Sequence, residues 1–243
     1  TVPTASISPA WSDLLAVRKS WWSFQPVGSP KVPSGPAISP IDRFLDAKLA
    51  VAKIAPAGPA DKATLLRRVT YVLTGLPPTP AELTAFEADG SADAYAKVVD
   101  RLLASPCFGE HFARHWMDLV RYADSHGSEG DPAIPYSWRY RDYLIRAFNA
   151  DVPYDQFVRE QIAGDLIPSP RHDSSGADRS VVGTGFWYLG EEIHSPVDIA
   201  QDSADRTDNR VDTFGKAFLG LALGCARCHD HKFDAISKED YYA

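Results

Sequence analysis

Cysteine, methionine and long apolar runs are scarce in this sequence. Among its 243 residues there are three cysteines and one methionine. Three cysteines are too few for a disulfide scaffold in a chain of this length. The longest weakly polar stretch, residues 181–190, has about half the length that crosses a bilayer, so we expect no membrane span. No cluster of lysines and arginines occurs and the net charge is −7, so we expect no nucleic-acid partner.

The residues that are present fit a globular protein. Hydrophobic residues make up 44% of the sequence and charged residues 23%, which is enough to bury a substantial core. The acidic balance suits a basic protein partner. The closing letters "SKEDYYA" begin like a helix capped by Ser237 and then stop, so we expect a fragment of a longer chain.

The first 40 residues differ from the rest in composition. They hold seven prolines and three of the six tryptophans. Because proline lacks an amide donor and has a fixed φ, such a segment is a poor helix former. We therefore expect an extended Pro/Trp-rich arm over residues 1–40 and a helical domain over residues 41–243.

Helix signals dominate this second part. Ser39 and Pro40 open one helix as cap and first residue. Thr79 and Glu82 form a capping box, and Gly75 lies where a left-handed C-cap residue belongs. With the apolar spacing, these signals predict helices over 39–50, 61–75, 79 onward, 91–104, 105–124, 137–151, 154–164 and 198–224.

The expected fold class is therefore all-α, an irregular multi-helix domain with an extended N-terminal arm and covalently bound haem c, the last for the reason given next. The stretch "VVGTGFWYLG", residues 181–190, is the only strand candidate. The polar loop 168–180 is the place where the domain would divide into two parts.

The stretch "GCARCHDHKFDAI", residues 224–236, carries the chemistry. Cys225, Cys228 and His229 form Cys-x-x-Cys-His, the attachment sequence for c-type haem. The two thiols add across the haem vinyl groups, and the imidazole coordinates iron. The motif predicts one covalent haem c with His229 as proximal ligand. Because haem c is attached outside the cytoplasm, the motif also predicts a periplasmic or otherwise exported protein, with Cys107 as the only remaining thiol.

Two other uses of the thiols stay open. A zinc-binding structural module would need two further ligands, and the adjacent Cys228 and His229 cannot easily both reach one tetrahedral ion. A redox-active dithiol usually opens a helix that follows a strand, whereas here a predicted helix ending at Gly224 comes first. Haem attachment is favoured because it also accounts for the histidine.

Five longer motifs carry a resemblance to a known family. They are "FLGLALGCARCHDHKFDAISKEDYY", "RHWMDLVRYADS", "LLRRVTYVLTGLPPTPAEL", "WRYRDYLIRAFNADVPYDQFVREQIAGDL" and "YLGEEIHSPVD". Together they resemble the planctomycete-type cytochrome c domain family, a domain of unknown function, over roughly residues 40–243. The resemblance implies haem without establishing a reaction. It also implies an exported protein in which a second domain follows in the same polypeptide.

The residue opposite His229 on the iron decides between an electron carrier and an enzyme. His115 lies at the border of the apolar face of its predicted helix, where a bond to a neighbouring carboxylate is the more common role. His194 lies in a loop before a helix that we expect to start with Ser195 and Pro196. Both are candidates for the sixth ligand or for a distal acid/base group.

An acidic series occupies one side of the predicted helix 198–224. Its members, spaced by three and four residues, are Asp198, Asp202, Asp205, Asp208 and Asp212. The simplest interpretation is a solvated helix face, and the alternative is a docking surface for a basic partner.

The sequence thus supports three functional hypotheses. The first is a c-type cytochrome domain that transfers electrons to or from a partner, either the C-terminal domain of the same polypeptide or a separate redox protein. The second is a haem c enzyme that oxidises a carbohydrate-derived or other periplasmic substrate at an open iron site. The third is the zinc-binding structural module.

Overall fold

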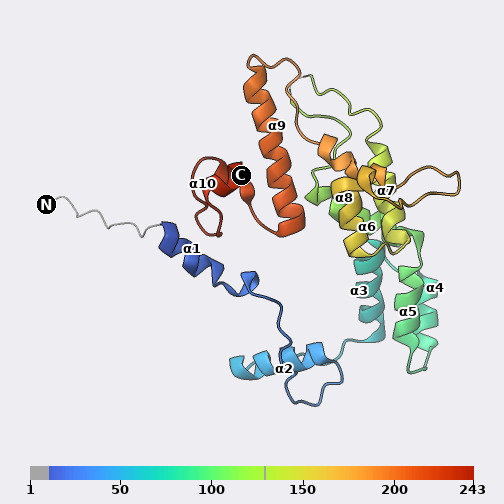
Figure 1. Ribbon diagram of the computed structural model, residues 1–243. Helices are drawn as coiled ribbons and strands as arrows, with labels where there is room; N and C mark the ends of the chain where they lie inside the picture. Colours follow the sequence, from blue (N-terminus) through green and yellow to red (C-terminus); the bar gives the residue numbers. More distant parts are fainter. Residues whose placement is uncertain (1–10, 129) are drawn as a thin grey trace. The chain divides into compact units, whose positions relative to one another are not determined.

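The computed structural model describes residues 11–128 and 130–243, and its regular structure is helical (Figure 1). The expected all-α fold class is confirmed. Within these residues no β-strand forms, and only two isolated bridges occur, between Ser125 and Ala133 and between His172 and Asp178. None of the helices in the described ranges combines the length and the apolar character needed to cross a bilayer.

The elements follow one another in a simple order. The α-helices are α1 (Trp11–Lys19), α2 (Pro40–Ala52), α3 (Lys62–Thr74), α4 (Pro80–Ala88), α5 (Ala94–Leu103), α6 (Pro106–Leu119), α7 (Trp138–Asn149), α8 (Tyr154–Ala163), α9 (Ile199–Phe214) and α10 (Lys238–Tyr242). The short elements are the 3₁₀ helices η1 (Trp22–Phe24), η2 (Gly164–Leu166), η3 (Val181–Tyr188) and η5 (Leu223–Arg227) and the π-helical turn η4 (Gly215–Leu219).

The chain divides into two compact units, with the boundary in the sequence between Leu65 and Leu66. In the first unit, no side chain of residues 11–65 is buried. The second unit carries the hydrophobic core and the cysteine motif. The arm boundary at residue 40 and the division near 168–180 stay predictions.

The N-terminal segment differs in part from the extended arm that its prolines predict. Residues 11–19 fold as α1 and residues 22–24 as η1, whereas residues 26–35 have no regular structure. No proline falls within α1, and Arg18 and Lys19 in its last turn suit the negative end of the helix dipole. The part of the predicted arm in residues 1–10 lies outside the described residues.

Short-range helix signals are confirmed where they involve neighbouring residues. Thr79 and Glu82 form the expected capping box at the start of α4. Ser39 and Pro40 occupy the cap and first positions of α2. Gly75 follows α3 with a left-handed backbone, φ 70°. Each signal acts within one turn, so it does not depend on the rest of the fold.

The core lies between α6, α7, α8 and η3. Its buried members are Ala113, Trp116, Val120, Ile134, Tyr140, Tyr143, Leu144, Ala147, Phe157, Phe186 and Leu189. The Trp116 indole donates to the Tyr140 hydroxyl at 3.2 Å, and that hydroxyl donates to Oε1 of Gln161 at 2.7 Å. These bonds satisfy polar groups of aromatic side chains that are otherwise fully packed.

The predicted strand at residues 181–190 is wrong, because this segment forms the 3₁₀ helix η3. A Cβ atom at Gly183 would lie 2.6 Å from the carbonyl oxygen of Glu160. A Cβ at Gly185 would lie 3.1 Å from the ring of Tyr140. The two glycines therefore let η3 approach α8 and α7 closely, and burial in this contact overrides the strand propensity of the apolar letters.

For the helix before the cysteines, expected over 198–224 as one helix or two consecutive ones, the start at Asp198 is confirmed, whereas the start at Ser195 and Pro196 and the end at Gly224 are not. α9 begins at Ile199, and the Asp198 carboxylate accepts the backbone N–H of Gln201 at 2.9 Å, so Ser195 and Pro196 do not open it. After α9 and η4 the chain turns at Gly220, φ 66°. The expected end at Gly224 is wrong, since that residue lies inside η5.

Candidate functional site

The cysteine motif lies on a tight turn that packs against α9. Cys225 is in η5, and Cys228 and His229 follow directly. The backbone N–H of Gly224 donates to Oδ1 of Asp212 at 3.1 Å. A Cβ at Gly224 would lie only 3.0 Å from the same oxygen, so the absence of a side chain allows this approach.

The residues of the motif differ in their exposure to solvent. Ala226 is 0% exposed, and the side chain of Arg227 points to α9, where it forms two ion pairs. Cys225, Cys228 and His229 are exposed. The turn therefore buries Ala226, holds the half-buried Arg227 against α9 and leaves both cysteines and the histidine exposed.

Arg227 is the main anchor of this turn. Its Nη2 lies 2.5 Å from Oδ1 of Asp205, and its Nη1 lies 3.2 Å from Oδ2 of Asp208. The hydroxyl of Tyr241 donates to the other oxygen of Asp208, and that of Tyr242 donates to the carbonyl of Arg227 at 3.0 Å. The hydrogen bond and charge of Asp205, joined by Asp208, raise the pKa of Arg227 above its ordinary value, so it is charged at any physiological pH.

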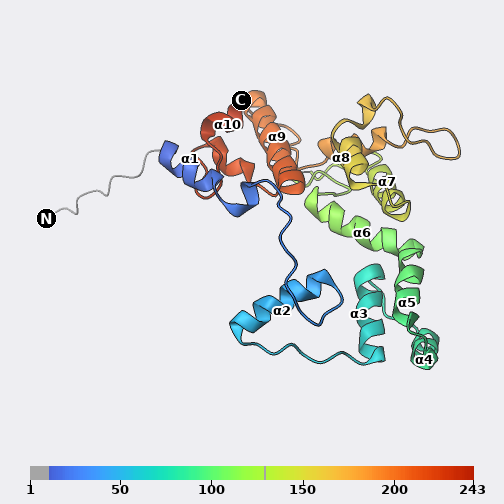
Figure 2. The same ribbon diagram turned by 60° about the horizontal axis from the view of Figure 1, so that its bottom comes forward.

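α10 completes the arrangement by folding back beside α9 (Figures 1 and 2). Its start is fixed by a capping box between Ser237 and Asp240, which confirms Ser237 as the expected cap. The backbone N–H of Lys238 also donates to Oδ1 of Asp230, at 2.9 Å. The side chain of Asp230, just after the cysteine motif, is thus bonded to the backbone at the start of α10.

The acidic series of α9 is not a purely solvated face. Asp205, Asp208 and Asp212 bind the cysteine turn as described. Asp198 caps the helix, and Asp202 pairs with Arg206 one turn later at 2.8 Å. All five aspartates have partners within the chain, and the face is only partly exposed: Asp198 and Asp205 are exposed, and the other three are half-buried.

His229 has one ring nitrogen committed and one uncommitted in the described structure. Its Nδ1 lies 2.8 Å from the carbonyl oxygen of Asp230. A carbonyl oxygen can only accept, so Nδ1 carries the proton and Nε2 keeps its lone pair. A histidine that donates through one nitrogen and ligates through the other is the usual arrangement of a metal ligand.

His231 has a different role. It is buried, and its Nδ1 accepts backbone N–H groups of Phe233, at 3.2 Å, and Asp234, at 2.7 Å. Its own N–H donates to the carbonyl of Ile236 at 2.9 Å. These bonds make His231 a structural residue of the turn.

The donor set fits covalent haem c. Thioether formation needs two accessible thiols on one turn, and iron ligation needs an imidazole with a free lone pair beside them. Cys225, Cys228 and His229 meet these requirements. In residues 11–128 and 130–243, no three or more His, Cys, Asp or Glu side chains are gathered as a metal site, so the two extra ligands required for tetrahedral zinc are not assembled beside the cysteines.

His115 lies on the exposed side of α6 beside another histidine. Its Nε2 is 3.3 Å from Nε2 of His111, and the two rings meet edge to face. A Cβ at Gly75 would lie 2.6 Å from Nδ1 of His111, so this pair faces the end of α3. Burial, with the nearby His115, lowers the pKa of His111, which keeps it neutral near pH 7. The expected carboxylate partner of His115 is not among its contacts here.

His194 lies in the exposed loop before α9, as expected. Two residues earlier, Glu192 pairs with Arg206 of α9 at 2.6 Å. Arg206 is adjacent to Asp205, which holds Arg227. Two residues of chain span at most about 7 Å. The loop that carries His194 is therefore tied to the same turn of α9 as the cysteine motif.

Sequence reasoning missed His126. This histidine is buried, its Nδ1 donates to the carbonyl of Gly190 at 3.0 Å, and its Nε2 lies 3.7 Å from Glu192. It thus fixes the start of the loop that leads to His194. No local pattern marks it, because its partners lie more than 60 residues away in the chain.

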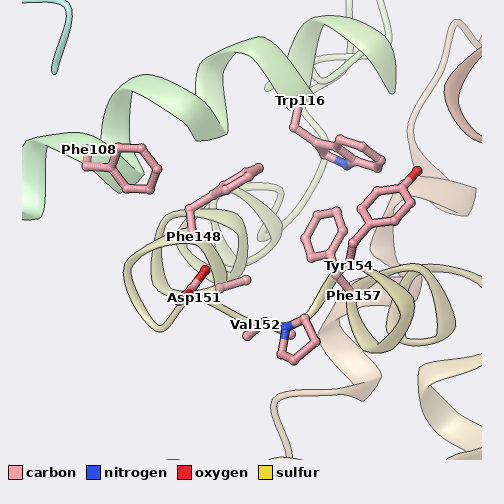
Figure 3. A pocket seen from close by; sticks show the side chains of 9 residues that line it. Phe108, Trp116, Phe148, Asp151, Val152, Tyr154 and Phe157 are labelled. Atoms are coloured by element: carbon pink, nitrogen blue, oxygen red, sulfur yellow. The ribbon is translucent and has the colours of Figure 1, made fainter. Parts of the chain in front are cut away.

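One hollow lies between α6, α7 and α8, and no residue of the cysteine motif lines it. It has a volume of about 300 Å³ and is lined by Phe108, Trp116, Ala147, Phe148, Asp151, Val152, Pro153, Tyr154 and Phe157. Figure 3 shows aromatic rings around the opening, with Asp151 as the single charged group among them. Neither a histidine nor a cysteine is among these lining residues.

The family of this chain follows from its similarity to a known family model. A family model described as PSCyt2, a protein of unknown function (DUF1549), matches residues 40–243. This chain belongs to that family. The match begins at Pro40, the first residue of α2, and includes the cysteine turn and both candidate sixth ligands.

The PSCyt2 name marks a cytochrome c-related domain, and the family description leaves its function open. The expected resemblance is thereby confirmed at the level of the family. No curated protein matches the chain, and no solved structure matches it. Haem attachment, the sixth ligand and the compartment stay predictions.

Proposed function

We propose that this chain is a c-type cytochrome domain that binds one haem covalently through Cys225 and Cys228. His229 is the proximal iron ligand, through Nε2. The observation that carries the proposal is the turn itself. Its middle residues are anchored on α9 while both thiols and the imidazole are exposed.

The attachment chemistry needs no group beyond these thiols and the porphyrin. Each thiol gives its sulfur to one carbon of a vinyl group and its hydrogen to the other, so a C–S and a C–H bond replace one S–H and one C=C bond. Nothing leaves and no oxidant is consumed. Because cells perform this attachment outside the cytoplasm, we place the protein in the periplasm or another exported location.

A bound haem supplies one-electron redox chemistry. The exposure of Cys225, Cys228 and His229 directs that chemistry outward, where a partner surface can approach. We therefore propose electron transfer to or from a partner. The partner is the C-terminal domain of the same polypeptide or a separate redox protein.

The test is to produce the chain in the periplasm of a host with haem-maturation machinery. We expect a red protein whose mass exceeds that of the bare polypeptide by one haem. Its pyridine spectrum should show two thioether links. Cys225→Ser should shift that spectrum toward one link, and Cys107→Ser, the matched control, should leave it unchanged. A colourless wild-type protein of bare mass that binds zinc through its thiols would refute the proposal.

For the sixth ligand, the contacts favour His194 over His115. The loop of His194 is attached to the α9 turn that holds Arg227. His115 is instead paired with His111, and that pair faces Gly75 at the end of α3. We propose that His194, rather than His115, would supply the second imidazole to the iron of a bound haem, which would then serve electron transfer.

Histidine replacements test this assignment in the haem-loaded protein. His194→Ala should convert a six-coordinate spectrum, insensitive to carbon monoxide, into one that responds to it. His115→Ala should have no such effect, nor should His172→Ala, an exposed loop histidine used as control. If His115→Ala alone changes the spectrum, His115 is the ligand. If the wild-type protein already binds carbon monoxide or cyanide, the open-site enzyme becomes the better interpretation.

A further inference from the structure

The two middle residues of the motif are structural contacts rather than free positions. Ala226 is completely buried, so a larger side chain has no room there. Arg227 reaches two carboxylates on successive turns of α9, Asp205 and Asp208. The motif therefore meets α9 through residues that haem attachment itself does not require.

A third carboxylate fixes the entry to the turn. Asp212 accepts the backbone N–H of Gly224, and its other oxygen pairs with Lys216 one turn later at 2.5 Å. A Cβ at Gly215 would lie 2.5 Å from Cγ of Leu223, so the chain also crosses closely at the end of α9. The turn is thus held before the first cysteine and between the two cysteines.

The exit from the turn is held by α10. Tyr241 donates to Asp208, which already binds Arg227, and Tyr242 donates to the carbonyl of Arg227. One aspartate therefore joins the motif and α10 in a single network. Shared partners of this kind couple energetically, so the loss of one contact weakens the others.

We propose that Asp205, Asp208, Asp212 and Arg227 form a clamp that positions the Cys225–His229 turn for haem attachment before haem arrives. The role of the clamp in attachment rests on the proposed function. Without it, the turn would sample many conformations, and both thiols and the imidazole would seldom face the same side. With it, part of the ordering is complete before attachment, which is the general advantage of preorganisation. These four residues are positioning residues and do not react.

The experiment compares Asp208→Asn and Arg227→Gln in the full chain, first without haem. Amide hydrogen exchange of residues 223–230 should become about threefold to tenfold faster in both variants, the scale that couplings within one network produce. Exchange in α6 and α7 should stay unchanged, which shows that the fold persists. In the double variant, exchange of residues 223–230 should be no faster than in the single variant with the faster exchange.

The second readout is the fraction of chains that carry two thioether links after maturation. It should fall by about the same threefold to tenfold in both variants. The substitutions change the local charge in opposite directions, so a purely electrostatic effect on the thiols would have opposite signs. Arg227→Lys, which keeps the charge but loses the planar fork, should lie between the wild type and Arg227→Gln. Asp155→Asn, which removes an exposed carboxylate that pairs with Arg159 on α8, should match the wild type.

Each outcome decides the question. Unchanged exchange in both variants overturns the clamp, whether or not haem is attached. Faster exchange with a wild-type yield of thioether links overturns its role in attachment. If the wild-type chain takes up no haem, the proposed function falls, and the exchange data still decide whether the turn is clamped.

Discussion

Glu160 is a fully buried carboxylate, and its charge depends on four side chains around it. Arg171 forms two hydrogen bonds to it, at 2.6 and 2.7 Å. Tyr143, Ser180 and Gln156 donate further bonds, at 2.8, 3.0 and 3.2 Å. Burial alone would raise the pKa of Glu160, but these bonds and the Arg171 charge outweigh it and hold the pKa below its ordinary value.

This arrangement predicts a defined effect of pH on stability. Because the pKa of Glu160 is lower in the folded chain than in the unfolded one, its contribution is complete above the unfolded pKa of about 4.3. The contribution is lost as the pH falls through the lower, folded value. Glu160→Gln should reduce the free energy of unfolding at pH 7 by about 3 kcal/mol, because Arg171 loses its partner.

Urea unfolding at a series of pH values checks this prediction. The difference between wild type and Glu160→Gln should shrink as the pH falls from about 5 toward 3. Glu110→Gln, a replacement of an exposed glutamate on α6, is the control and should change stability by less than about 0.5 kcal/mol. A difference that grows toward acid would contradict the lowered pKa.

At the scale of single residues, the sequence identified the candidate site but not the residues that support it. Cys225, Cys228 and His229 could be recognised because haem attachment requires fixed residue types at fixed spacing. Arg227 could not be linked to Asp205, since the two lie 22 residues apart and meet only after the chain folds back. Without knowledge of Arg227 as a partner, the aspartates of α9 cannot be distinguished from those of an ordinary exposed helix face.

Among the helices, α6 and α7 cross so closely that one glycine is required. A Cβ at Gly109 would lie 2.4 Å from the carbonyl oxygen of Ile145 and 2.5 Å from Cγ of Asn149. The side chain of Asn149 also accepts the N–H of Gly109 at 2.8 Å and donates to the carbonyl of Pro106 at 3.1 Å. α7 thereby binds the first turn of α6.

We predict that Gly109→Ala destabilises the chain, although alanine is the better helix former by about 1 kcal/mol. The backbone oxygen of Ile145 cannot move aside without shifting α7, and overpacking of this kind costs about 1–3 kcal/mol. Gly90→Ala is the control, because nothing lies within 4 Å of its Cβ position. Thermal unfolding followed by circular dichroism measures both. A higher midpoint for Gly109→Ala would mean that helix propensity outweighs the contact.

Elements defined by neighbouring residues were predictable, and elements defined by distant contacts were not. The capping box at Thr79 and the left-handed Gly75 act within one turn and appear as expected. The segment Val181–Tyr188 contains residues with a high propensity for β-strands, yet no strand pairs with it in the described residues. Its glycines fit against α7 and α8, which no local pattern reveals.

At the scale of the whole molecule, the two ends of the chain differ in how they contribute to the buried core. Residues 11–65 contain no buried side chain, and the family match begins only at residue 40. We therefore predict that removal of residues 1–39 changes the free energy of unfolding by less than about 0.5 kcal/mol. Urea unfolding measures the change.

The C-terminal end should behave differently in the same assay. Removal of residues 238–243 deletes the hydrogen bonds of Tyr241 to Asp208 and of Tyr242 to Arg227. Two such bonds contribute about 1–3 kcal/mol together. A large loss of free energy of unfolding after removal of residues 1–39 would show that the N-terminal segment is part of the folded core. No loss after removal of residues 238–243 would show that α10 is not.

The complete burial of Ala226 has a consequence for how related chains can be recognised. A Cys-x-x-Cys-His pattern allows any residue at its two middle positions, whereas in this fold the first is completely buried and the second forms two ion pairs with α9. An upstream helix must then supply acids three residues apart. Relatives with a large residue at the first middle position therefore need a different packing of this turn against the helix, so the two positions divide chains that the pattern alone would group together.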